Sequence, residues 1–70
     1  MEKLYRTVRK GDLIRFTVRG YGDMIIAFVL EAYHYEGIPE QYETLFFVHL
    51  IEFNEKMYLE PSDLEQLEIL

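Results

Sequence analysis

Few side chains in this sequence are of the kinds that carry out covalent chemistry. There is no cysteine, and the one serine, Ser62, stands three residues before Glu65 in a pattern typical of a helix cap. The threonines have no evident base beside them, so no nucleophile is paired with a group that would activate it. Gly20 and Gly22 form a segment much shorter than a phosphate-binding loop. We therefore expect that the protein is not an enzyme.

The two histidines would need further ligands to bind a metal ion. His34 and His49 fall on predicted strands that are neighbours if the segment between them forms a hairpin. A zinc site needs three or four converging ligands, and nothing in the spacing of the sequence indicates the others. A histidine at the core or the edge of a sheet is the simpler interpretation. We therefore predict neither a metal nor any other cofactor.

The charged residues are divided unevenly along the chain. The formal net charge is -6, yet six of the seven basic residues fall within the first nineteen positions. These residues are Lys3, Arg6, Arg9, Lys10, Arg15 and Arg19. Most carboxylates follow in the remainder of the chain. Such separated charges either pair with each other inside the fold or present two different surfaces to partners.

The amino-terminal arginines are candidate nucleic-acid-binding residues. Arg15 and Arg19 share the outward face of one predicted strand, with Thr17 between them. Arg6 and Arg9 precede this strand. A basic stripe of this kind contacts phosphates in nucleic-acid-binding proteins. No stacking aromatic residue alternates with these arginines, which favours the other interpretation, ion pairs across the sheet.

Tyrosines and carboxylates gather in the middle of the chain and form the candidate protein-binding site. Tyr33 and Tyr35 project from the same face of a predicted strand, and an acidic loop follows them. Tyrosine combines a rigid apolar ring with a polar tip and is a common anchor in protein interfaces. The alternative is that these rings cap one end of a barrel and are half buried. The candidate site consists of Tyr33, Tyr35, Glu36, Glu40, Tyr42 and Glu43.

Length and composition indicate one small globular domain over residues 1–70. Half of the residues are hydrophobic, which is too many for a disordered acidic tail. A chain of this size buries only about 60% of its unfolded surface, so we expect a homodimer or another homo-oligomer to add stability. The longest uncharged run, Met24–Leu30, is too short to span a bilayer, and the amino terminus lacks the apolar core of a signal peptide. We expect a cytoplasmic protein without membrane association.

Short apolar runs between turn residues predict an all-β fold, a small barrel of about five antiparallel strands. The clearest strand is Leu13–Arg19, where Ile14, Phe16 and Val18 lie on one face. Met24–Tyr35 is predicted to be a long strand, either buried on both sides or bent between two halves of a barrel. The other predicted strands are Leu4–Arg9, Thr44–Phe53, Met57–Leu59 and Leu67–Leu70.

Two features of these strands leave alternatives open. A 3₁₀ turn at Ser62–Glu65 is expected before the last strand, and the alternative is a short amphipathic helix with Leu64 and Leu67 on one face. The segments Met24–Leu30 and Leu45–Ile51 combine high β-propensity with almost no charge. Exposed segments of this kind are prone to aggregate, so barrel closure or dimerisation must cover them.

Three short motifs mark the ends of the predicted strands. Lys10-Gly11-Asp12 leads into an alternating strand, Gly22 precedes a long strand, and Pro61-Ser62-Asp63-Leu64 makes a turn before a last strand. Together they resemble SH3-like small barrels of the KOW and Tudor kind. The likeness covers residues 10–70 and implies an SH3-like barrel fold.

This resemblance has consequences for the charged residues. The first and last strands of SH3-like barrels lie close together, which implies that Arg6 or Arg9 lies near Glu65 and Glu68. The chain is more acidic than the nucleic-acid-binding members of this class. The resemblance therefore implies a fold more than a function.

Three functions follow as hypotheses. The first is a noncatalytic binding module, a small acidic accessory or inhibitory protein of the kind that phages encode, whose tyrosine-bearing acidic loop binds a basic protein surface. The second is a KOW-like barrel that binds nucleic acid through Arg6, Arg9, Arg15 and Arg19. The third is an oligomer with a small-ligand pocket at its subunit interface. The first is favoured, because the carboxylates outnumber the basic residues.

Overall fold

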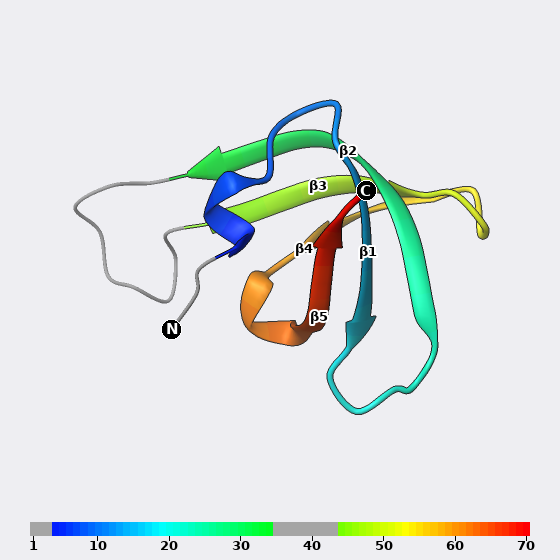
Figure 1. The fold of residues 1–70 in the computed structure, drawn as a ribbon. Coiled ribbons are helices and arrows are strands. Elements are labelled where there is room, and N and C mark those ends of the chain that lie inside the picture. The colour runs from blue at the N-terminus through cyan, green and yellow to red at the C-terminus, as the bar shows by residue number, and fades with distance from the viewer. Residues whose placement is uncertain (1–3, 35–43) are drawn as a thin grey trace.

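The computed structural model describes residues 4–34 and 44–70, which form one antiparallel sheet with two short 3₁₀ helices. In chain order the elements are η1 (Leu4–Thr7), β1 (Leu13–Val18), β2 (Met24–His34), β3 (Thr44–Leu50), β4 (Glu55–Leu59), η3 (Pro61–Asp63) and β5 (Leu64–Ile69) (Figure 1). The strand order in the sheet is β4-β3-β2-β1-β5. The predicted all-β fold of about five antiparallel strands is confirmed, and so is a 3₁₀ turn before the last strand.

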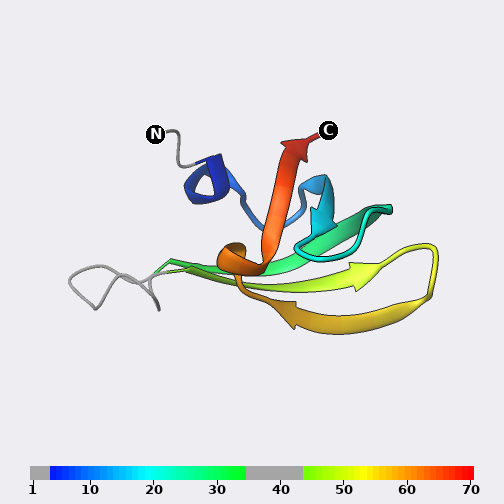
Figure 2. The ribbon, with the colours of Figure 1, turned by 90° about the horizontal axis from the view of Figure 1, so that it is seen from below.

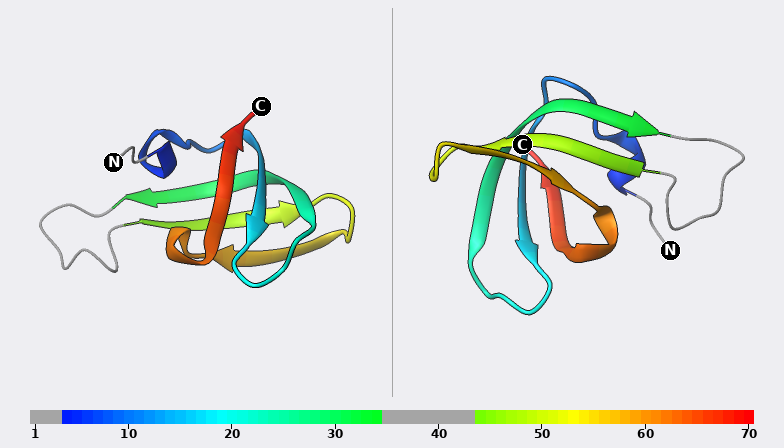
Figure 3. Two further views of the ribbon diagram at one scale, coloured as in Figure 1. Left: turned by 60° about the horizontal axis from the view of Figure 1, so that its bottom comes forward. Right: turned by 180° about the vertical axis from the view of Figure 1, so that it is seen from behind.

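The long strand β2 bends the sheet. Its 11 residues pair with β1 and with β3, and the register with β3 shifts between Val29 and Glu31. Such a bulge adds one residue to one strand, which kinks the strand and increases its twist. As a result, β1 and β5 cross the layer made by β3, β4 and the end of β2 at a steep angle (Figures 2 and 3). Of the two alternatives for this strand, the structure has the bent one, and its outward side chains are exposed, so the strand is not buried on both sides.

The core lies in the concave side of the bent sheet. Alternation along β1 directs Ile14 and Phe16 inward, as predicted, and both side chains are fully buried. They meet the inward side chains of the other four strands and Val8 from the segment before β1. The remaining core residues are Ala27, Val29, Phe46, Val48, Leu50, Leu59 and Leu64. All five strands therefore contribute to a single core.

The amino-terminal segment is a helical turn, so the predicted strand at Leu4–Arg9 is wrong. Val8 N donates a hydrogen bond to Tyr5 O at 3.3 Å, and both side chains pack on the core. Residues three apart share a face in a 3₁₀ helix, whereas in a strand they would point to opposite faces. The spacing of Tyr5 and Val8 therefore suits the turn.

The ends of the later strands differ from the predicted ones. β3 ends at Leu50, and the four residues after it form a turn that closes at Asn54, whose φ of 54° lies in the left-handed region. β4 consequently begins at Glu55 rather than at Met57. Asparagine tolerates this conformation better than most residues, which explains the position of the turn.

The carboxyl-terminal segment is a strand, so the helical alternative for this segment is wrong. β5 starts at Leu64, directly after η3, and not at Leu67. The predicted cap of Ser62 and Glu65 is also wrong, because η3 has no side-chain cap. Instead, the carbonyl oxygen of Ser62 and the carboxylate of Glu65 both accept hydrogen bonds from Arg19.

Neither 3₁₀ helix within residues 4–34 and 44–70 is long and apolar enough to cross a bilayer.

Candidate functional site

The predicted acidic, tyrosine-bearing site falls mainly in the part of the chain that is not described. Tyr33 is the exception: it lies near the end of β2, half buried, with its Cα opposite that of Leu45 on β3. It therefore faces the convex side of the sheet, because the neighbouring pair Ala32 and Phe46 faces the core. The residues outside the described ranges are Tyr35, Glu36, Glu40, Tyr42 and Glu43.

The two arginines of β1 and its following loop are paired with β5. Antiparallel pairing places Arg15 opposite Glu68, and the two side chains form a salt bridge. Arg19 Nη1 lies 3.0 Å from Glu65 Oε2, and its guanidinium also donates to Ser62 O. These pairs are partly exposed, so each contributes about 0.2–1 kcal/mol to stability. We call them, with the two strands that carry them, the β1–β5 seam.

The side chain of Arg9, which precedes β1, binds the local backbone. Arg9 Nη1 donates hydrogen bonds to Arg6 O at 2.7 Å and to Val8 O at 3.1 Å. Lys10 Nζ lies 3.5 Å from Glu31 Oε2 on β2. Glu65 and Glu68 meet Arg19 and Arg15, because β5 pairs with β1 itself. The 3₁₀ turn that carries Arg6 also contacts β5, so the expected approach of Arg6 or Arg9 to these carboxylates stays a prediction.

The two histidines lie on opposite faces of the sheet. His34 Nε2 donates to Val8 O at 3.0 Å, and its Nδ1 is 3.4 Å from Thr44 Oγ1, so the ring ties the amino-terminal segment to β2 and β3. His49 pairs with Phe28 on the convex face, and its Nε2 is 3.0 Å from Asn54 Oδ1. Among residues 4–34 and 44–70, no three potential metal ligands are grouped together. Each ring has a structural partner instead.

The convex face of β2 is apolar and exposed. Met24, Ile26 and Phe28 alternate outward from the first half of this strand, each with about two fifths of its surface accessible. The inward side chains Ala27 and Val29 are fully buried. The run Met24–Leu30 is thus a central strand, but only one of its faces is covered within the described part of the chain.

At the end of this face an open groove of about 720 Å³ separates the β1–β2 loop from the β3–β4 turn. Two aromatic side chains and a methionine line it, and two carboxylates border them. The full lining comprises Val18, Tyr21, Asp23, Met24, Ile25, Glu52 and Phe53. We call this site the β1–β2/β3–β4 groove.

A smaller pocket of about 210 Å³ adjoins this groove. Val18 and Ile25 line both, and the smaller pocket extends between β4, η3 and the first residue of β5, Leu64. It marks the place where the two edge strands of the sheet approach each other without pairing in the described residues. The groove is therefore continuous with the smaller pocket between the two edge strands and lies on its outer side.

Sequence reasoning missed this groove, although the chain contains a local signal for it. Each of its two turns places an aromatic residue close to an acidic one: Tyr21 with Asp23, and Phe53 with Glu52. Large aromatic residues in turns are unusual choices for solvent exposure, since Gly, Pro, Asn, Asp and Ser dominate there. No protein-family model, curated protein or solved structure matches the chain. What it does must therefore be inferred from its own residues.

Proposed function

We propose that the protein is a noncatalytic binding module, a cytoplasmic accessory or inhibitory protein of the kind that phages encode, which engages a basic surface of another protein. The observation that carries this proposal is the β1–β5 seam. Its carboxylates neutralise Arg15 and Arg19, the cations that would otherwise face a nucleic acid. The charge that is left over on the molecule is negative.

Several exposed carboxylates support this proposal. Within residues 4–34 and 44–70 they form no salt bridge, although each is on the surface; they are Asp23, Glu52, Glu55, Glu60 and Asp63. Unpaired surface charge of one sign attracts a partner of the opposite sign, raises the association rate and makes binding sensitive to salt. The acidic residues of 36–43 add to this field.

The proposed contact is the predicted site around Tyr33. Tyrosines would supply rigid contact area, and Glu36 and Glu40 would meet the partner's basic residues. The partner is identified by a pull-down from the native host at low salt. The double variant Glu36→Lys with Glu40→Lys should then weaken its binding, measured by surface plasmon resonance at low and high ionic strength.

The control is the double variant Glu55→Lys with Glu60→Lys, which changes the net charge equally at the two ends of β4. Binding that is unchanged in the loop variant at low salt would refute the proposed contact. Equal loss in both variants would show that attraction depends on total charge and not on the loop.

Two competing functions are decided by separate measurements. Binding of single-stranded or duplex oligonucleotides at low ionic strength, followed by fluorescence anisotropy, would favour a nucleic-acid-binding role for Arg6, Arg9, Arg15 and Arg19. The paired state of Arg15 and Arg19 argues against that role. A stable oligomer in analytical ultracentrifugation, with a small molecule retained in native mass spectrometry, would favour a ligand pocket between subunits.

A further inference from the structure

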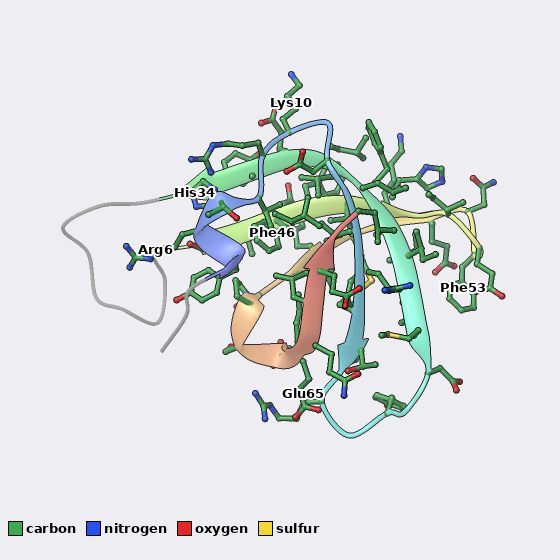
Figure 4. The ribbon with its side chains drawn as sticks, in the orientation of Figure 1. Arg6, Lys10, His34, Phe46, Phe53 and Glu65 are labelled. Atoms are coloured by element: carbon green, nitrogen blue, oxygen red, sulfur yellow. The ribbon has the colours of Figure 1, made fainter. Side chains whose placement is uncertain are left out.

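The β1–β2/β3–β4 groove lies far from the proposed contact around Tyr33. Phe53, on the β3–β4 turn, and His34, the residue after Tyr33, are at opposite ends of the molecule (Figure 4). Met24 and Tyr33 likewise lie near the two ends of β2. The groove is therefore distinct from the end of β2 that carries Tyr33.

Short hydrogen-bonded turns hold both walls of the groove. Tyr21 N donates to Val18 O at 2.8 Å, in a loop where Gly20 adopts a φ of 91°. On the other wall, Ile51 N donates to Ile26 O at 3.2 Å, and His49 Nε2 lies 3.0 Å from Asn54 Oδ1. Walls that are ordered before binding lose little entropy when a ligand arrives, which favours recognition.

The apolar side chains of the groove are exposed to an unusual degree. Tyr21 is 74% exposed, Phe53 56% and Met24 44%. Exposed aromatic residues that flank a concavity are a common feature of protein-interaction sites. The apolar convex face of β2 continues from Met24 to Ile26, so the groove is one end of a longer apolar surface.

The acidic residues of the groove favour a positively charged ligand. Asp23 and Glu52 lie among its lining residues, and no lysine or arginine does. Neither carboxylate forms a salt bridge within the described part of the chain. The ligand must therefore combine a positive charge with apolar surface.

We propose that this groove binds an arginine side chain that a protein partner presents beside an apolar residue. A guanidinium is planar, stacks on aromatic faces such as those of Tyr21 and Phe53, and donates hydrogen bonds to two carboxylates at once. The arginine's aliphatic stem and the neighbouring apolar residue cover the exposed carbons of Met24. Lysine, a compact and strongly hydrated charge, fits this combination less well.

This inference rests on the proposed function in one respect, namely that the partner is a basic protein. It differs in the place of contact and in the residue that is recognised. The groove and the residues around Tyr33 can therefore be tested independently.

The test is a titration of the ¹⁵N-labelled full chain with three capped tetrapeptides, followed by NMR. The peptides are acetyl-Ala-Leu-X-Ala-amide, where X is arginine, lysine or citrulline. The arginine peptide should shift the amide signals of the groove residues, and its affinity should exceed that of the citrulline peptide about tenfold, as expected for loss of charge-assisted hydrogen bonds. The lysine peptide should bind with intermediate affinity.

Two matched double variants separate the two proposals. Asp23→Asn with Glu52→Gln removes the two charges of the groove, and Glu36→Gln with Glu40→Gln removes two charges from the predicted loop site. The groove variant should lower the affinity for the arginine peptide about tenfold, and the loop variant should leave it unchanged. Phe53→Ala should also lower it, because the stacking surface is lost.

Each other outcome overturns the inference. Equal binding of the arginine and citrulline peptides would show that charge is not recognised, and shifts elsewhere on the chain would misplace the site. Loss of binding in the loop variant alone would refute the groove and support the contact around Tyr33. Dispersed NMR spectra of all variants confirm that they fold.

Discussion

The β1–β5 seam and the groove are built from similar residues and use them in opposite ways. In the seam, Arg19 meets Glu65 and the charges neutralise each other inside the fold. In the groove, Asp23 and Glu52 flank apolar side chains and have no cation among the lining residues. The difference lies in where the carboxylates are placed: Glu65 and Glu68 are on β5, which pairs with β1, whereas Asp23 and Glu52 are on connections between strands. The carboxylates on the paired strand stabilise the fold, whereas those on the connections remain for a partner.

The largest difference in stability is expected between two variants, one with an aromatic residue truncated in the core and one with an aromatic residue truncated in the groove. Phe16→Ala should lower the free energy of unfolding by about 3–5 kcal/mol, because it leaves a cavity in a fully buried site. Phe53→Ala should change it by about 0.5 kcal/mol or less, as expected for an exposed residue. Urea denaturation followed by circular dichroism measures both.

If Phe16→Ala does not fold, Phe16→Leu, which keeps more of the apolar volume, provides the comparison. A Phe53→Ala variant as unstable as the core variant would mean that the groove is structural. It would then be part of the core and not a surface left for a partner.

A substitution in the β1–β2 loop is expected to lower the stability of the protein by an intermediate amount. Gly20 has a φ of 91°, so Gly20→Ala should destabilise the protein by about 1–2 kcal/mol. Gly22, two residues later, has no positive φ and no atom within 4 Å of an added Cβ. Gly22→Ala should therefore be tolerated or slightly stabilising. Thermal unfolding of the two variants checks this matched pair, and equal destabilisation would refute the role assigned to Gly20.

The smallest energy is expected for the coupling between two charged residues of the seam. A double-mutant cycle of Arg19→Ala and Glu65→Ala should give a coupling energy of about 0.2–1 kcal/mol that declines as salt is added. The same cycle with Arg19 and Glu52, which form no salt bridge, should give none within error. A larger coupling for the second cycle would contradict the division between seam and groove.

Where side chains alternate, the sequence was enough to predict the fold. The pattern of Ile14, Phe16 and Val18 predicted β1 and its buried face, and the apolar run from Met24 predicted a long strand that is either buried on both sides or bent. Both follow from local periodicity. The failures occurred at Leu4–Arg9 and at the end of β3, where a few residues fit either a strand or a turn. There the decision depended on contacts with the core, such as those of Tyr5 and Val8.

The candidate site could be predicted less well than the fold. The seam was anticipated as cross-strand pairing, but the arginines involved depended on the register of β1 with β5. The groove depended on bringing Tyr21 and Phe53 to the same end of the molecule, which is a result of the bend in β2. No local pattern encodes that bend at the required position. The predicted contact around Tyr33 stays a prediction.

The last strand carries a further consequence of its irregular pairing. Gln66 has a φ of 56°, and the register between β1 and β5 shifts beside it, between Arg15 and Thr17. β5 is an edge of the sheet, and a regular edge would be a template onto which another chain could add a strand. The irregularity interrupts the row of backbone groups that such a template requires. The β5 edge is thereby a poor template for the addition of a strand from another chain.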